Sequence, residues 1–171
     1  GANVLGYSLK PKSTKNFFNK INLSKEINSV IGNIKNYKKL SKLIDEFQPD
    51  IIFHMAAQPL VIDSYINPRD TYETNVIGTL NILESLRSNK KIRVFINITT
   101  DKCYLNNSSK KDFIESDSLG GHDPYSSSKA CSEILTASFR DSFFFDNKFA
   151  LCAIWVNFVS FSPVIQYRFF L

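Results

Sequence analysis

The chain has 171 residues, of which 43% are hydrophobic and 22% charged, and its formal net charge is +5. These values predict one ordinary globular domain and exclude a disordered chain, a collagen-like repeat and a small disulfide scaffold. Because the three cysteines (Cys103, Cys131 and Cys152) show no C-x-x-C spacing and only two histidines occur, we expect no metal site and a reducing, cytoplasmic compartment.

The first predicted element is a strand at residues 3–6, and the segment after it is the most basic part of the chain. Nine lysines and a single acid, Glu26, lie between Lys10 and Lys42. Such a charge run is found in nucleic-acid-binding proteins, but this one has no arginine and few aromatic rings for base stacking. We therefore interpret it as solvated surface and expect no nucleic-acid partner.

Apolar strands and amphipathic helices alternate along the rest of the chain. A short apolar run at 30–31 is followed by a helix whose apolar face is formed by positions 40, 43, 44 and 47, and residues 51–53 predict a buried strand. Asn67 and Pro68 have the residue types that begin a helix, and the stripe Tyr72, Val76, Leu80 and Leu83 extends this helix to about residue 88.

Residues 94–98 predict another buried strand, and a second long helix opens at Asp123 and Pro124 with Ile134 and Leu135 facing inward. A final strand is expected at 149–154. This alternation predicts an α/β fold with a parallel sheet covered on both faces. The aromatic segment 149–171 is interrupted by polar residues and Pro163, so we expect no membrane span there. No charged region with an apolar core precedes the strand at 3–6, so we expect no signal peptide.

Polar residues follow the strand at 94–98, at the sheet edge where open α/β sheets bind ligands. The run Thr99–Lys102 combines hydroxyl, carboxylate and ammonium groups suited to proton transfer, although a loop ion pair between Asp101 and Lys102 would explain them equally well. Tyr125 and Lys129 lie four residues apart on one helix face, and an ammonium beside a phenol lowers the phenol pKa.

Several segments carry a family resemblance. They are HMAAQPLV (54–61), TNVIGT (74–79), TDKCY (100–104) and GGHDPYSSSK (120–129). Together they resemble the extended short-chain dehydrogenase/reductases and, within them, the CDP-glucose 4,6-dehydratases. The resemblance covers about residues 1–154 and implies a Rossmann-like doubly wound parallel sheet, NAD as cofactor and CDP-glucose as substrate.

The resemblance also implies roles for individual residues. Tyr125 would remove the C4 hydroxyl proton, assisted by Lys129, while Thr100 would bind the C4 oxygen. Asp101 and Lys102 would remove the C5 proton and protonate the departing C6 hydroxyl. The implied product is CDP-4-keto-6-deoxyglucose, a deoxysugar precursor for lipopolysaccharide O-antigen. The cofactor contacts that it implies are Asn33, Ile34, Ala56, Ala57, Gln58, Asn75, Thr99, Tyr125 and Lys129.

Two parts of the family pattern are missing from the sequence. None of the six glycines makes the Gly-x-x-Gly-x-x-Gly turn of a dinucleotide-binding fold, so we expect an incomplete sheet that lacks its first, central strand. From Trp155 onward no family pattern continues. We interpret residues 1–154 as a partial NAD-binding domain and residues 155–171 as a divergent tail without the substrate domain, with a frameshifted or truncated gene or a partial sequence as the hypothesis.

Three functions stay open at this point. The first is a dehydratase fragment, inactive as an isolated chain. The second is a fragment of an NAD-dependent nucleotide-sugar epimerase, against which the Asp101–Lys102 pair argues because epimerisation removes no water. The third is a non-catalytic remnant or interaction module. The family associates through a helix pair matching residues 70–88 and 125–145, which predicts a homo-oligomer.

Overall fold

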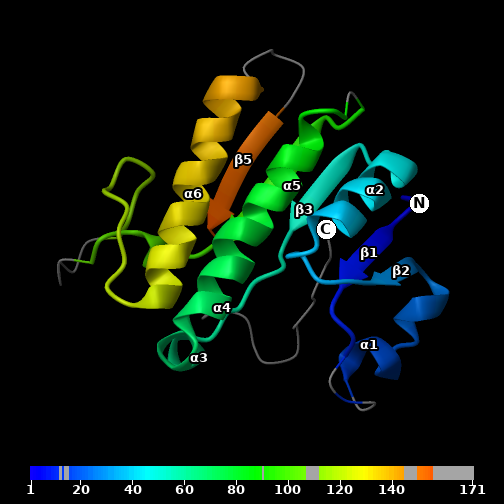
Figure 1. Ribbon diagram of the computed structural model, residues 1–171, viewed down its shortest axis with the longest axis horizontal. Helices are drawn as coiled ribbons and strands as arrows, with labels where there is room; N and C mark the ends of the chain where they lie inside the picture. The colour runs from blue at the N-terminus through cyan, green and yellow to red at the C-terminus, as the bar shows by residue number, and fades with distance from the viewer. Residues whose placement is uncertain (12, 14–15, 90, 107–111, 145–149, 156–171) are drawn as a thin grey trace.

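The computed structural model of the chain (Figure 1) describes residues 1–11, 13, 16–89, 91–106, 112–144 and 150–155. Its strands are β1 (Leu5–Ser8), β2 (Asn28–Ile31), β3 (Ile51–His54), β4 (Val94–Thr99) and β5 (Ala150–Trp155). Its α-helices are α1 (Phe17–Lys20), α2 (Tyr37–Phe47), α3 (Val61–Ile66), α4 (Pro68–Tyr72), α5 (Gly78–Leu86) and α6 (Pro124–Phe143). Two short 3-10 helices, η1 (Leu23–Lys25) and η3 (Asp101–Cys103), and one π-helical turn, η2 (Glu73–Ile77), complete the description.

All strand pairs are parallel, as the alternation of strands and helices predicts. β1 pairs with β2, while β3, β4 and β5 form a separate sheet in that order. Within the described residues, β1 has no strand partner on the side away from β2, and β3 has none on the side away from β4. The ladder is therefore interrupted between β1 and β3, in agreement with the incomplete Rossmann-like sheet expected from the sequence.

Both parts of the sheet nevertheless share one hydrophobic core. α2 packs against α5 and α5 packs against α6, so these helices lie side by side (Figure 1). The core beneath them joins Tyr7 of β1 to Ile52 of β3, Phe95 of β4 and the buried apolar side chains of the three helices. The amino-terminal pair is thus fixed by side-chain packing, because no main-chain ladder joins it to the larger sheet.

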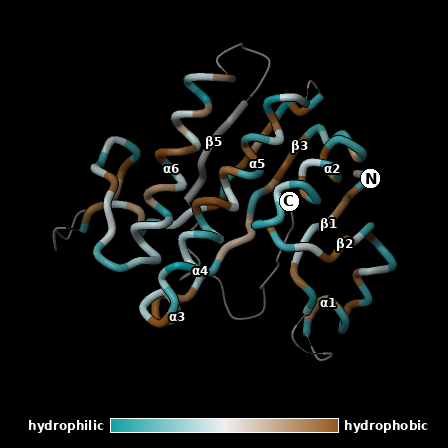
Figure 2. Tube along the Cα trace, viewed as in Figure 1, coloured by the Kyte–Doolittle hydropathy of each residue, from teal (hydrophilic) through white to brown (hydrophobic). Residues whose placement is uncertain are grey.

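On the opposite face of the larger sheet, the described side chains of β3 are partly exposed. Ile51 and Phe53 alternate with the buried residues of β3, and they are 48% and 44% exposed. Figure 2 shows the hydrophobic character of this strand. Burial in β3 and β4 alternates with a period of two, because every second side chain of these strands points into the core that they share with the helices.

The long helix expected after Asn67 is present but buries a different face. Asn67 caps α4 by accepting a hydrogen bond from the backbone of Asp70, and α4, η2 and α5 then follow without a break. Tyr72 is exposed and Val76 and Leu80 are only partly buried, so of the predicted stripe only Leu83 is fully buried. The buried face begins instead with the polar residues Thr71, Asn75 and Thr79. Their side chains form hydrogen bonds with Gln58 and Ser132 on neighbouring segments, and the π-helical turn changes which residues of the helix face inward.

The predicted second long helix is α6, and its start is fixed by local chemistry. Asp123 caps it by accepting a hydrogen bond from the Ser126 backbone, and Pro124 occupies its first turn. Leu135 packs partly against the core as expected, whereas Ile134 is 56% exposed, so its predicted inward orientation is wrong. Small and polar residues take the inner face because α6 approaches the sheet closely there.

No helix in the described part of the chain is long and apolar enough to cross a membrane. Of the predicted tail at 155–171, only Trp155 belongs to the described residues, as the last residue of β5.

Candidate functional site

The predicted catalytic residues start where β4 ends. Thr100 caps η3: its Oγ1 accepts a hydrogen bond from the Lys102 backbone at 3.4 Å and donates one to Asp101 Oδ1 at 3.1 Å. Asp101 and Lys102 are not joined by an ion pair among the described residues; each side chain faces a cavity. The loop salt bridge considered from the sequence therefore does not account for this pair.

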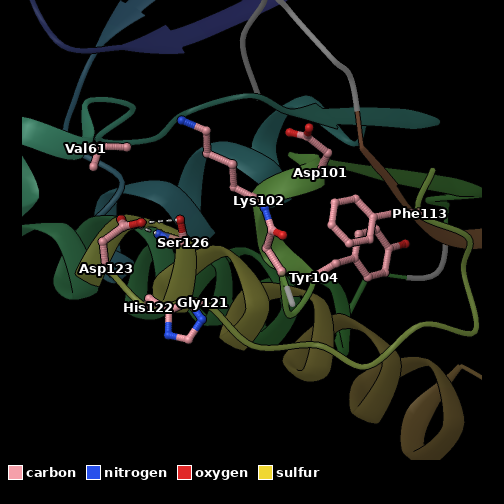
Figure 3. A pocket seen from close by; sticks show the side chains of 10 residues that line it. Val61, Asp101, Lys102, Tyr104, Phe113, Gly121, His122, Asp123 and Ser126 are labelled. Atoms are coloured by element: carbon pink, nitrogen blue, oxygen red, sulfur yellow. Dashed lines mark hydrogen bonds between the residues drawn. The ribbon is translucent and has the colours of Figure 1, made fainter. Parts of the chain in front are cut away.

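A cavity of about 350 Å³ lies between η3 and the start of α6 (Figure 3). Figure 3 shows the rings of Tyr104 and Phe113 beside each other at one side, and their centroids are 5.2 Å apart. The remaining wall is mostly polar and includes a carboxylate and an ammonium of the motif itself. The lining residues are Val61, Asp101, Lys102, Tyr104, Asn106, Phe113, Gly121, His122, Asp123 and Ser126.

Asp123 adds a second carboxylate to this cavity. Its two oxygens accept hydrogen bonds from the backbone and the hydroxyl of Ser126, at 3.0 and 2.6 Å. Burial acts to raise the pKa of Asp123, but these hydrogen bonds and the charge of Lys102 outweigh it and hold the pKa below its usual value. The cavity thus contains a stable anion at the helix start, which the sequence suggested only as a helix cap.

Tyr125 lies next to this cavity in a buried position, with 9% of its surface exposed. Burial raises the pKa of the phenol, whereas a hydrogen bond with the Thr100 side chain acts to lower it. The net direction is opposite to the lowering expected from Lys129, because the cost of burying a phenolate is larger here than the favourable contacts. The structure does bring Thr100 and Tyr125 together, as the predicted site requires.

Lys129 follows one turn later on α6 and is buried, with 6% of its surface exposed. Its Nζ donates a hydrogen bond to the Ile98 carbonyl oxygen at 3.2 Å. Burial lowers the pKa of Lys129 to about 8, while the charge of Glu133 opposes that shift. The ammonium is therefore held at the end of β4, one residue before Thr99.

Two of the predicted cofactor residues, Gln58 and Asn75, are hydrogen-bonded to each other beside α6. Asn75, in the π-helical turn, accepts a hydrogen bond from the Gln58 backbone at 2.8 Å and donates to its carbonyl at 3.1 Å. The Asn75 side chain also donates to Ser128 Oγ on α6 at 2.8 Å. The loop after β3, which contains Ala56 and Ala57, is thereby fastened to the helix that carries Tyr125 and Lys129.

Asn33 and Ile34 lie apart from this group, in the loop after β2. The Asn33 carbonyl accepts a hydrogen bond from the Tyr7 hydroxyl at 3.0 Å, and its side chain accepts one from the Lys35 backbone at 2.9 Å. The Ile34 side chain is buried in the core, where it contacts Gly78 at the start of α5. The buried Ile34 side chain is therefore not available to a ligand, whereas Asn33 is exposed.

A buried polar network behind these residues was not identified from the sequence. His54 Nε2 lies 2.9 Å from Thr79 Oγ1, which lies 3.1 Å from Ser132 Oγ on α6. Asn97 donates to Ser132 and to Thr136, both at 2.9 Å. The one sequence signal was the replacement of apolar residues by His54 and Asn97 at the strand ends, where the two are register partners.

Glu133 is a further residue that the sequence analysis did not select. It is one turn beyond Lys129, and its Oε1 accepts a hydrogen bond from Thr99 Oγ1. The helical spacing of Tyr125, Lys129 and Glu133 was the available signal, because residues four apart share a face.

The chain is similar to several known proteins. The profile of the family described as GDP-mannose 4,6 dehydratase matches residues 5–169. The CDP-glucose 4,6-dehydratase of Salmonella typhimurium is 45% identical over 144 residues, which are 84% of this chain and 40% of that protein. The chain therefore spans about two fifths of the length of this curated relative.

Solved structures share the fold. The UDP-glucose 4-epimerase of Thermotoga maritima, solved with UDP-glucose, superposes with a TM-score of 0.74 at 22% identity, covering 84% of this chain and 45% of the epimerase. The dTDP-glucose 4,6-dehydratase of Bacillus anthracis, solved in complex with NAD, has a TM-score of 0.67 at 25% identity, covering 90% of this chain and 44% of that one.

Proposed function

The chain belongs to the GDP-mannose 4,6 dehydratase family, and from that premise we propose that it forms part of a nucleotide-sugar 4,6-dehydratase that acts on CDP-glucose. The product would be CDP-4-keto-6-deoxyglucose and one water. The observation that carries this proposal is the cavity in which Asp101 and Lys102 face the start of α6, next to the buried pair Thr100 and Tyr125. The 45% identical relative supports the choice of CDP-glucose.

The residues at the ends of β3 and β4 have the chemistry that the nicotinamide end of NAD requires. Lys129 offers a buried ammonium, and Asn75 holds the Gln58 loop beside it. We assign Ala56, Ala57, Gln58, Asn75, Thr99, Tyr125 and Lys129 to this end, and Asn33 and Ile34 to the adenine end. When bound, NAD supplies the acceptor for a hydride from C4 of the sugar and returns that hydride to C6.

Tyr125 and Thr100 are placed to act on the C4 hydroxyl. Tyr125 as phenolate accepts the hydroxyl proton, and the Thr100 hydroxyl donates a hydrogen bond to the same oxygen. Because burial raises the pKa of Tyr125, the phenolate needs the charge of Lys129 and the Thr100 hydrogen bond to form at neutral pH.

Asp101 and Lys102 would remove water from C5 and C6. The 4-keto group acidifies the C5 proton, which one member of this pair removes, while the other donates a proton to the departing C6 hydroxyl. Loss of that hydroxyl forms the C5–C6 double bond, and the returning hydride at C6 and a proton at C5 complete the product. Both side chains line the same cavity (Figure 3), which supports their acting on C5 and on the adjacent exocyclic C6 of one sugar.

We further propose that residues 1–154 act as part of an NAD-binding domain in the cytoplasm, as a homo-oligomer formed through the long helices, in deoxysugar synthesis for lipopolysaccharide O-antigen. The interruption between β1 and β3 in the described residues leads us to expect weak or no turnover by the chain alone, because a dinucleotide needs both parts of the sheet held in register.

The test is an incubation of the chain with NAD and CDP-glucose in D₂O, followed by mass spectrometry and NMR of the sugar. A dehydratase yields a nucleotide sugar that has lost one water and carries solvent deuterium at C5. An epimerase yields an isomer of unchanged mass with no C5 deuterium, which would overturn the proposal. Thermal unfolding with and without millimolar NAD shows separately whether the cofactor binds, because binding to the native state raises the midpoint.

A further inference from the structure

The face of α6 that meets the end of β4 carries three ionisable side chains in succession. Tyr125, Lys129 and Glu133 are spaced four residues apart, so they form one row along the helix. Tyr125 and Lys129 already have proposed functions. Glu133 is only partly exposed, whereas glutamate side chains in proteins are mostly exposed unless they are paired.

Two hydrogen bonds fasten this row to consecutive residues of β4. The Lys129 ammonium donates to the carbonyl oxygen of Ile98 at 3.2 Å, and Glu133 Oε1 accepts from the hydroxyl of Thr99. Thr100, which bonds Tyr125, is the next residue. The Glu133 carboxylate is therefore held against the strand end, on the same face as the Lys129 ammonium.

The other titratable groups around Lys129 are neutral or face the cavity, so Glu133 is its counter-ion. From β3, His54 is neutral, because burial and the nearby Lys129 lower its pKa to about 3. From η3, Cys103 is neutral, because burial and the charge of Glu133 raise the thiol pKa to about 12, and Asp101 is directed to the cavity. Among the described residues, the Glu133 carboxylate is the group whose negative charge acts against the burial of this ammonium. Burial raises the pKa of Glu133 itself, while the hydrogen bond from Thr99 and the charge of Lys129 act to lower it.

We propose that Glu133 is a positioning residue for the Tyr125–Lys129 pair: its carboxylate, clamped by the Thr99 hydroxyl, supplies the counter-charge that keeps the buried Lys129 ammonium protonated. A buried ammonium without a nearby anion loses its proton readily. Neutral Lys129 could no longer stabilise a phenolate at Tyr125. This inference rests on the proposed function of that pair, but its physical content concerns only the protonation of Lys129.

The sequence offers a near-isosteric test. Glu133→Gln removes the charge but keeps an amide oxygen that can accept from Thr99, so the clamp stays while the counter-charge goes. The readout is the titration of Lys129, followed by NMR in protein labelled at lysine Cε, with the Lys129→Arg variant assigning the signal. Neither NAD nor a sugar is present, so the result is independent of whether the proposed reaction occurs.

We expect Glu133→Gln to lower the apparent pKa of Lys129 by about 1 relative to the unsubstituted chain. The matched control is Glu84→Gln, which removes a carboxylate of α5 that pairs with Arg87 at the surface, and it should leave the Lys129 titration unchanged. An unchanged titration in folded Glu133→Gln protein overturns the proposal, because a purely structural hydrogen bond would survive the exchange.

Thr99→Val provides a second test if the glutamine variant does not fold. It leaves the Glu133 charge but removes the hydroxyl that holds it, so the carboxylate can turn toward solvent. We expect the apparent pKa of Lys129 to fall by less than in Glu133→Gln. A Lys129 titration identical to that of the unsubstituted chain would contradict the clamp and with it the proposal.

Discussion

The sheet β3–β4–β5 and the pair β1–β2 belong to one core but are stabilised differently. In β4 every second residue is buried under α5 and α6, whereas β2 contains no fully buried residue. β1 contributes Tyr7 and little else to the shared core. The proposed reaction chemistry lies on the larger sheet, and the loop assigned to the adenine end lies on the smaller pair.

This difference shows which part of the molecule can hold reacting groups in fixed orientations. Around β4, hydroxyl, amide, ammonium and carboxylate groups are held in fixed orientations by burial and by bonds to α6. Around β2, Ile34 meets Gly78 of α5 and Lys35 pairs with Asp70 of α4. The reacting groups can thus be preorganised by buried polar bonds, while the smaller pair is joined to the rest of the molecule by side-chain contacts with the helices.

The largest effect should come from deleting a core side chain of the larger sheet. Phe95 is fully buried in β4, so Phe95→Ala should lower the free energy of unfolding by about 3–5 kcal/mol. The comparison variant is Val30→Ala in β2, where the side chain is only partly buried and a loss of about 1 kcal/mol is expected. Urea denaturation measures both. Equal losses would show that the two regions are equally well packed.

Acid should act mainly on the larger sheet, through His54. Burial, together with the charge of Lys129, lowers the pKa of His54 to about 3 in the folded chain. The unfolded chain therefore binds an extra proton between about pH 6.5 and pH 3, and stability falls as the pH is lowered through this range.

We expect a loss attributable to His54 of about 2 kcal/mol between pH 6.5 and pH 5, at about 1.4 kcal/mol per pH unit. The measurement is the free energy of unfolding against pH for the unsubstituted chain and for His54→Gln, which should show the shallower dependence. If the free energy of unfolding depends on pH equally in both proteins, His54 is accessible to solvent in the folded chain, and this region excludes water no better than the other.

The junction between the two regions can be tested at Gly78. A Cβ added there would lie 2.7 Å from Cγ2 of Ile34, a buried and branched side chain that cannot turn away. Gly78→Ala gains about 1 kcal/mol of helix propensity but costs more through overpacking, so a net loss of about 1 kcal/mol is expected.

The decisive variant is the pair Gly78→Ala with Ile34→Ala, in which the clash is removed. The loss for the pair, measured by urea denaturation, should be smaller than the sum of the two single losses. If the loss in the free energy of unfolding for the pair equals the sum of the two single losses, the Ile34 side chain and position 78 are not in tight contact.

The smallest effect is expected from the ion pair that spans the regions. Lys35 Nζ lies 2.7 Å from Asp70 and 3.4 Å from Glu73, and the side chains are partly solvated. Asp70→Asn should cost less than about 1 kcal/mol, and the difference should vanish in 1 M salt. Glu46→Gln, which breaks an exposed pair with Lys42 inside α2, is the control and should cost about 0.3 kcal/mol. A salt-independent loss in Asp70→Asn would contradict the electrostatic explanation.

Much of the fold could be read from local patterns. Apolar runs at 51–53 and 94–98 located β3 and β4, helical spacing of positions 40, 43, 44 and 47 located α2, and Asp123-Pro124 marked the start of α6. The order of these elements was enough for an α/β fold with parallel strands, because a strand–helix–strand unit has few other solutions. The spacing of Tyr125 and Lys129 likewise placed them on one helix face.

Which helix face is buried was less predictable. Tyr72 and Ile134 were expected inside and are exposed, while Thr71, Asn75, Thr79 and the serines of α6 are inside. Hydrophobicity alone assigns polar residues to the surface, yet a polar residue can be buried when its partners on other elements satisfy it. Those partners are 13 to 53 residues distant in the chain.

The amino-acid sequence by itself therefore determined the succession of elements, the parallel α/β class and the family motifs, since these depend on residue type and short spacing. Only the tertiary structure decided how one core joins β1–β2 to β3–β5, the burial of His54, the contact of Ile34 with Gly78 and the clamp between Thr99 and Glu133. Each of these is a contact between distant parts of the chain, and such contacts are fixed by packing and by the mutual satisfaction of buried polar groups, which no local pattern encodes.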